Sequence, residues 1–182
     1  MTAFFLLFAV FPFFFASMGK KETTSTETPR EKNEGDMGQP KKYLEEKHTP
    51  PEFKKKFFAA LQNVDIGVFD PRILYTVASL ETGNGTGGIF RKARNLFSIT
   101  IGGNWKGDYY ETASGLKFRI YGKWEDSIKD FVRLMGIGIY KNAYEAARRK
   151  DAKQFFVELK KAGYDATSPT YATDLFKKYQ EA

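Results

Sequence analysis

Apolar positions along the chain follow two different spacings. Spacing of three and four residues, typical of helices that bury one face, follows Pro51, Asp70 and Trp124. Alternation of apolar and polar residues, typical of strands, flanks a small turn at Ala113–Gly115. Three further helices are expected at residues 142–150, 151–162 and 170–180. The pattern therefore predicts a mainly α (α+β) domain, in which a helical bundle and one small β-hairpin lobe enclose a cleft.

The helix predicted from Asp70 to Glu81 has a charged residue on its buried face. Glu81 comes one helical turn after Val77, so its carboxylate points along the apolar side of the helix. Glycines from Gly83 onward end the helix and leave Glu81 in its last turn, where the helix dipole is negative. Burial and this dipole both favour the protonated acid, which a general acid requires. A structural glutamate that only hydrogen-bonds the glycine loop is the alternative.

The N-terminus is an apolar run from Ala3 to Met18, too apolar for a soluble fold. It is shorter than the roughly 20 residues that span a bilayer, and it lies at the upper edge of the roughly 7 to 15 of a signal-peptide core. Ser17 and Gly19 have the spacing of a signal-peptidase site, but no basic residue precedes the run. Residues 1–19 are therefore expected to be a cleaved signal peptide or an uncleaved membrane anchor. Either one places the remaining chain in the cell envelope or outside the cell.

A polar segment at residues 20–50 follows, and its composition predicts a flexible, disordered linker. Basic and acidic side chains balance within it, so the net charge of +7 belongs to the domain expected at residues 51–182. A basic, exported domain indicates an anionic polymer such as the cell wall as partner, although solubility alone would also explain the charge. Nucleic acid is not expected, because no basic run is interleaved with aromatic residues.

The composition leaves carboxylates as the main catalytic groups. Cysteine is absent and His48 is the single histidine, so neither a zinc hydrolase site nor a Ser-His-Asp triad can be assembled in the usual way. We expect no metal and no cofactor. Glu111, at the end of the first hairpin strand, is a second candidate, although an exposed glutamate at such a place is usually only solvated.

Several short motifs occur in an order that is specific when they are taken together. They are Ala78–Gly83, Asn95–Ile99, Asn104–Gly107, Phe118–Tyr121, Asp126–Asp130, Ala162–Tyr164 and Pro169–Ala172. With these motifs, the chain from about Phe53 to Tyr179 resembles the glucosaminidase family of peptidoglycan hydrolases, which includes flagellar muramidase-like domains and many autolysins. The resemblance implies a lysozyme-like fold and cleavage of the β-1,4 bond between N-acetylglucosamine and N-acetylmuramic acid in peptidoglycan glycan strands.

The resemblance also implies roles for the two glutamates. It makes Glu81 the general acid and puts a second carboxylate on the hairpin shortly before a turn glycine, as Glu111 stands before Gly115. Asp108 is the alternative for this second group. A carboxyl separation of about 5 Å would indicate a retaining reaction and about 6.5 to 9.5 Å an inverting one. The sequence leaves that choice open.

Four further residues match the family's substrate cleft. Asn95 and Phe97 are assigned to substrate binding, and Tyr164 and Tyr171 match tyrosines that stack on a sugar or fix a water. Core packing is the alternative for both tyrosines. Two other functions stay open on the same fold: an N-acetylmuramidase or lytic transglycosylase, and a glycan-binding module without turnover.

Overall fold

The computed structural model describes residues 45–102 and 105–182. The signal peptide or anchor expected at residues 1–19 and most of the expected linker lie outside the described residues. None of the helices in the described ranges is long and apolar enough to cross a membrane. The elements in chain order are α1 (Pro50–Leu61), α2 (Pro71–Glu81), α3 (Gly88–Ala93), β1 (Tyr109–Glu111), β2 (Lys117–Arg119), α4 (Trp124–Met135), the 3-10 helix η1 (Gly138–Tyr140), α5 (Lys141–Arg148), α6 (Ala152–Lys161) and α7 (Tyr171–Glu181).

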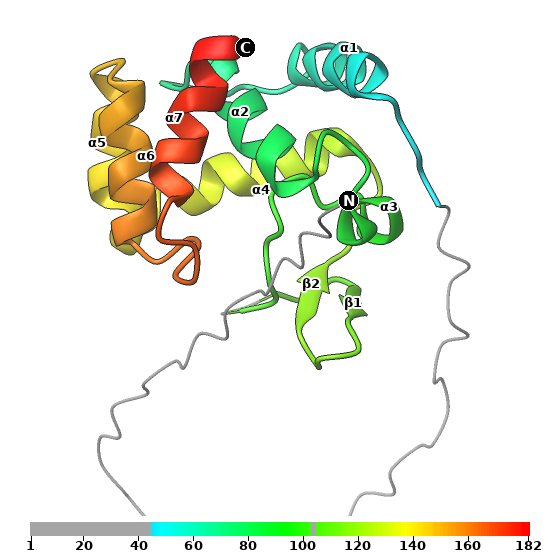
Figure 1. The fold of residues 1–182 in the computed structure, drawn as a ribbon. Coiled ribbons are helices and arrows are strands. Elements are labelled where there is room, and N and C mark those ends of the chain that lie inside the picture. Colours follow the sequence, from blue (N-terminus) through cyan, green and yellow to red (C-terminus); the bar gives the residue numbers. More distant parts are fainter. Residues whose placement is uncertain (1–44, 103–104) are drawn as a thin grey trace, which may run out of the picture.

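The helices pack into one lobe, and the hairpin forms a second one (Figure 1). Helix α2 packs between α1 and α7, α7 packs on α6, and α6 packs on α5. Helix α4 crosses below them and contacts α1 and α5, while the hairpin contacts α3. This confirms the mainly helical, two-lobe fold that the hydrophobic pattern predicts. The short helix α3 was not predicted, because its six residues are too few to show a helical period.

Helix α2 begins and ends as its sequence predicts. Asp70 caps it by accepting a hydrogen bond from Arg72 N at 2.8 Å, and a proline occupies the first turn. At the other end Thr82 Oγ1 donates to the Ala78 carbonyl at 2.7 Å and accepts from Gly85 N at 3.0 Å. Gly85 has φ +86°, and a Cβ there would lie 2.6 Å from the Phe53 ring. The chain therefore turns tightly against α1 directly after Glu81.

The hairpin lobe is attached to α4 through Asp130. Strands β1 and β2 are antiparallel, with Tyr109 opposite Arg119. Arg119 Nη1 donates to Asp130 Oδ2 at 2.6 Å and its Nε donates to the Thr100 carbonyl at 3.0 Å. Tyr121 OH donates to the same Asp130 oxygen at 2.7 Å. Two of the motifs found in the sequence, Phe118–Tyr121 and Asp126–Asp130, therefore hold the two lobes together.

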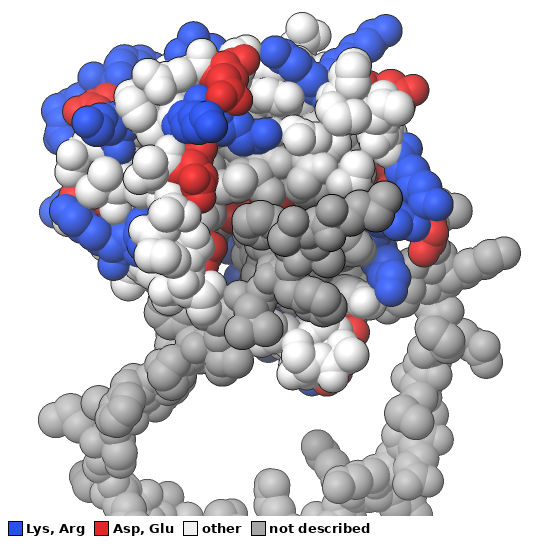
Figure 2. Space-filling model, in the orientation of Figure 1, with Lys and Arg blue, Asp and Glu red and all other residues white. Residues whose placement is uncertain are grey.

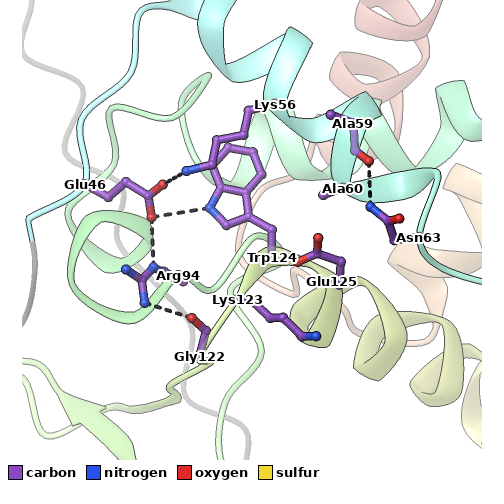
Figure 3. A pocket seen from close by; sticks show the side chains of 10 residues that line it. All are labelled: Glu46, Lys56, Ala59, Ala60, Asn63, Arg94, Gly122, Lys123, Trp124 and Glu125. Atoms are coloured by element: carbon purple, nitrogen blue, oxygen red, sulfur yellow. Dashed lines mark hydrogen bonds and ion pairs between the residues drawn. The ribbon is translucent and has the colours of Figure 1, made fainter.

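Residues 45–49, which the sequence assigned to the linker, make contacts with the domain. Glu46 accepts hydrogen bonds from Lys56, from Arg94 Nε at 3.0 Å and from Trp124 Nε1 at 3.3 Å, and lies 2.9 Å from His48 Nε2. Figure 3 shows Glu46 pointing toward Lys56, Arg94 and Trp124. Burial alone would raise the pKa of Glu46, but the bonds from these groups lower it to about 2. This short arm is therefore bound to α1, the end of α3 and α4.

A pocket of about 390 Å³ opens beside this arm (Figure 3). Its lining combines the Glu46 cluster with residues of α1 and α4: Glu46, Lys56, Ala59, Ala60, Asn63, Arg94, Gly122, Lys123, Trp124 and Glu125. Neither Glu81 nor Glu111 belongs to this lining.

Charged residues are spread over the helical lobe. Figure 2 shows lysine and arginine side chains over the upper, left and right parts of the domain in that view, with acidic side chains between them. On the face shown, the basic excess of the chain is therefore distributed among the helices, which suits a general attraction to an anionic polymer.

Candidate active site

Glu81 lies where α2 ends and α7 begins. It is the last residue of α2 and is half-buried, and Tyr171 is the first residue of α7 and only 3% exposed. Tyr171 OH donates a hydrogen bond to Glu81 Oε1 at 2.6 Å. The two groups meet because α2 and α7 pack against each other. Helix α7 thus contributes to the burial that the helical pattern predicts for Glu81.

The surroundings of Glu81 favour its protonated form. Burial raises the pKa of Glu81 to about 7, although the hydroxyls of Tyr171 and Ser98 act in the opposite direction. The negative charge of Asp165 raises the pKa further. Near neutral pH a large fraction of the molecules therefore holds a proton on this carboxyl. A carboxyl tuned in this way can act as a general acid.

Tyr164 lies beside Tyr171, the residue that hydrogen-bonds Glu81. Its ring stacks on that of Tyr171, with centroids 6.4 Å apart and planes at 24°, and its hydroxyl donates to the Phe97 carbonyl at 2.5 Å. Burial first, and then the negative charge of Glu81, raise the pKa of both tyrosines well above the ordinary range. Both phenols therefore stay neutral hydrogen-bond donors. The structure brings Tyr164 and Tyr171 together with Glu81.

Asn95 and Phe97 shape a turn instead of facing an open surface. Asn95 is 1% exposed; its Nδ2 donates to the carbonyls of Ile99 at 2.8 Å and Arg119 at 3.0 Å, and its Oδ1 accepts from Ile99 N at 2.9 Å. Phe97 is fully buried and stacks on Phe131, with centroids 4.2 Å apart. In this structure both residues therefore position the turn that carries Ser98.

The two hairpin carboxylates are exposed to solvent. Glu111 lies at the end of β1 opposite Lys117, and its side chain, 49% exposed, is 3.7 Å from Lys117 Nζ. Asp108 is exposed, and its carbonyl accepts a hydrogen bond from Trp105 Nε1 at 3.1 Å. Unlike Glu81, both residues are exposed on the hairpin lobe.

Asp165 and Ser98 influence the acid but were not predicted to do so. Asp165 Oδ1 accepts hydrogen bonds from Thr167 N at 3.0 Å and Ser168 N at 3.1 Å, which fixes the loop between α6 and α7. The spacing of an aspartate before Thr167 and Ser168 is typical of such a turn, so the loop itself was predictable. Its nearness to Glu81 depends on the packing of α2 against α7 and has no local signal.

Metal-ligating residues do not gather in the part of the chain that the structure describes. Within residues 45–102 and 105–182 no three side chains of the His, Cys, Asp or Glu type come together as a metal site requires.

Comparison with known proteins gives a family match over most of the domain. Residues 56–182 match the family called Glucosaminidase, described as "Mannosyl-glycoprotein endo-beta-N-acetylglucosaminidase". The peptidoglycan hydrolase FlgJ of Vibrio parahaemolyticus is 31% identical over 159 residues, which cover 74% of this chain and 50% of that protein. The chain thus spans about half the length of the curated relative that it matches.

Solved structures of similar proteins share the fold. The glycoside hydrolase domain of Salmonella typhimurium FlgJ is 26% identical, with a TM-score of 0.55, over 74% of this chain and 88% of that one. A peptidoglycan hydrolase from Sphingomonas sp. A1 is 28% identical, with a TM-score of 0.54, over 69% of this chain and 81% of that one. The catalytic domain of the Listeria monocytogenes autolysin Auto, 21% identical over 74% and 86% of the two chains with a TM-score of 0.52, shares the fold.

Proposed function

Because the chain belongs to the glucosaminidase family, we propose that it is a peptidoglycan hydrolase of the endo-β-N-acetylglucosaminidase type. It cuts the β-1,4 bond between N-acetylglucosamine and N-acetylmuramic acid in glycan strands. The family description names a glycoprotein substrate, but the Vibrio relative is named a peptidoglycan hydrolase, which favours the cell wall. The observation that carries the proposal is the half-buried carboxyl of Glu81, whose pKa burial raises to about 7.

Glu81 starts the reaction by giving its proton to the glycosidic oxygen. The bond between that oxygen and the anomeric carbon then breaks, and positive charge develops on the sugar ring. Tyr171 OH, 2.6 Å from Oε1, stabilises the negative charge that forms on Glu81 as its proton leaves. Because the pKa of Tyr171 lies well above the ordinary range, it donates this hydrogen bond without losing its own proton.

Glu111 is the proposed second carboxylate, which activates water or stabilises the charged sugar. Its pairing with Lys117 at 3.7 Å is exposed, and surface pairs of this kind contribute little to stability. Freeing the carboxylate for substrate therefore costs little. Asp108, on the same exposed lobe, is the alternative for this role.

A lytic transglycosylase is the second candidate, favoured by one observation. Glu81 is half-buried and has a raised pKa, whereas Glu111 is exposed beside a lysine. A reaction that uses one acid/base residue and closes an anhydro ring on the muramic acid would need no second carboxylate. An N-acetylmuramidase would leave muramic acid at the new reducing end instead.

Mass spectrometry of digested peptidoglycan separates these functions. Reducing ends of N-acetylglucosamine are expected from the chain, and Glu81→Gln is the matched control, which should release about 10² to 10⁴ times fewer. Reducing or anhydro muramic acid ends would replace the proposed reaction by one of the alternatives. Binding of glycan without any new ends would make the domain a binding module.

The proposed substrate places the protein's action in the cell envelope. The apolar run at residues 3–18 would supply export, either as a signal peptide or as an anchor. Fractionation of cells that produce the full chain tests this: recovery from the cytosol alone would contradict export.

A further inference from the structure

Tyr109, on strand β1, has a large side chain that the fold leaves exposed. Its exposed fraction is 42%, and among the large apolar side chains of the described residues only Ile137 and Ile139 are as exposed. Both isoleucines belong to the connection between α4 and α5, so Tyr109 is the one of the three that lies on the hairpin lobe. A single exposed apolar side chain is ordinary in proteins, so the case for a function depends on what surrounds it.

The strand register places Tyr109 on the same face of the hairpin as Glu111. The two residues are two positions apart on β1, and side chains at that spacing point to the same face of a strand. Their partners on β2, Arg119 and Lys117, belong to this face as well. At a rise of about 3.4 Å per residue, the two β1 side chains begin about 7 Å apart. A ligand that contacts the Glu111 carboxylate therefore comes within reach of the Tyr109 ring.

Lys117 connects Tyr109 to Glu111. Its Nζ lies 4.6 Å from the centroid of the Tyr109 ring, donates to the Tyr109 hydroxyl at 3.4 Å and is 3.7 Å from Glu111 Oε2. The hydrogen bond to Tyr109 and the charge of Glu111 raise the pKa of Lys117, so the cation persists at neutral pH. Lys117 lies over one face of the ring, yet the side chain is still 42% exposed. The opposite face of the ring is therefore open to a ligand.

The same face of the hairpin is joined to the surroundings of Glu81 through α4. Arg119, which shares this face with Tyr109, donates to Asp130 of α4 at 2.6 Å. The next residue of α4, Phe131, packs edge-on against Tyr164, with ring centroids 5.8 Å apart. Tyr164 in turn stacks on the tyrosine that hydrogen-bonds Glu81. One turn of α4 thus contacts both the hairpin face and the aromatic residues beside the acid.

We propose that Tyr109 is a substrate-binding residue: the open face of its ring stacks on an N-acetyl sugar next to the bond that is cut, while Lys117 holds the ring in place. A pyranose has C–H groups on its faces and hydroxyls at its rim, which suits a side chain with an apolar body and a polar tip. The Tyr109 hydroxyl accepts from Lys117, so its own hydrogen can serve a sugar oxygen. The proposal rests on the proposed function, since the sugar belongs to the substrate named there.

Binding is measured in the Glu81→Gln background, which keeps the site but cuts glycan at most slowly. Isothermal titration calorimetry with chitohexaose, a β-1,4-linked hexamer of N-acetylglucosamine, gives the dissociation constant. Adding Tyr109→Leu should raise this constant about three- to tenfold, because the sugar loses the aromatic ring on which it stacks. Tyr109→Trp, which supplies another aromatic face, should return it to within about twofold of the background. Because Tyr109 is exposed, both variants should keep the fold, which circular dichroism checks.

Tyr110→Leu is the matched control. Tyr110 is the next residue of the same strand, so its side chain lies on the opposite face, away from Glu111. Lys92 stands over its ring at 5.1 Å, much as Lys117 stands over that of Tyr109. Tyr110→Leu should therefore leave the affinity for chitohexaose unchanged. An equal loss of affinity in Tyr109→Leu and Tyr110→Leu would assign the effect to the hairpin as a whole and overturn the role of Tyr109.

The outcomes distinguish this proposal from the proposed function. Unchanged affinity in Tyr109→Leu overturns the stacking role, as does failure of the background chain to bind the hexamer, even if the parent cuts peptidoglycan. Affinity that depends on the Tyr109 ring supports the role even if the parent cuts no glycan, in which case the proposed function fails by itself. In an active chain, Tyr109→Leu should raise KM on soluble glycan strands about three- to tenfold with little change in kcat, because stacking stabilises bound substrate and transition state alike.

Discussion

Replacing Glu81 by glutamine is expected to stabilise the folded protein at alkaline pH while it abolishes most turnover. The carboxyl has a pKa of about 7 in the folded chain, against 4.5 for an ordinary glutamate. At about 1.4 kcal/mol for each pH unit, this difference corresponds to about 3 kcal/mol. Glutamine has nearly the same shape, and its amide oxygen can still accept the hydrogen bond of Tyr171. The gain therefore comes from the removal of a buried charge.

The sign of the effect follows from which state holds the proton. Between pH 4.5 and about 7, the unfolded chain has lost a proton that the folded chain still binds, so the free energy of unfolding falls as pH rises. Above this window the full cost remains, and below pH 4.5 it is absent. The variant has no such cost at any pH. The difference in the free energy of unfolding between Glu81→Gln and the parent is thus near zero at pH 4 and at most about 3 kcal/mol at pH 8. The value is an upper limit because a half-buried carboxyl keeps part of its hydration.

Denaturant unfolding at pH 4, 6 and 8 measures this gap, with the fluorescence of the buried Trp124 as signal. Glu111→Gln is the matched control: it removes an exposed glutamate and should show only a small difference in stability. On peptidoglycan, Glu81→Gln should lower turnover by about 10² to 10⁴. If parent and Glu81→Gln were equally stable both at pH 4 and at pH 8, the ionised Glu81 would not destabilise the fold. Near-parental turnover would refute the role of Glu81 as general acid.

Three other outcomes are expected. A chain that begins at His48 should melt about 5 to 10 °C below one that begins at residue 45, because it lacks the buried contacts of Glu46; equal melting temperatures in scanning calorimetry would make the arm a mere linker. Asp165→Asn should lower the pKa of the acid and move the alkaline limb of the pH–turnover profile down, which a pH series on labelled peptidoglycan measures. Glu111→Gln should slow turnover on labelled peptidoglycan, with glycan binding retained in a pull-down; parental turnover would transfer the role to Asp108.

The sequence was sufficient for elements with strong local signals. Asp70 with its following proline marked the start of α2, and the glycines after Glu81 marked its end. The spacing of apolar residues also showed that Glu81 belongs to the buried side of its helix. These features are local, because caps and periodicity act within one element.

Contacts between distant segments could not be read from the sequence. Glu46 has the composition of a linker residue, yet it lies among charged and aromatic groups of three helices. Asn95 matched a motif assigned to substrate binding, and in the structure its amide also hydrogen-bonds backbone groups of its own turn and of β2. A polar residue in a motif does not show which partner it will meet, since that depends on packing.

Groups from four segments that meet at the end of α2 determine the pKa of Glu81. Burial against α7 raises the pKa of Glu81 and the charge of Asp165 adds to this, while the hydroxyls of Tyr171 and Ser98 lower it. If the carboxyl were buried without hydrogen-bond donors, it would hold its proton too firmly to release it to a substrate near neutral pH. If it had the donors without the burial, it would not hold the proton at that pH. Because these opposing contributions come from separate elements, the pKa near 7 depends on the assembled domain and not on α2 by itself.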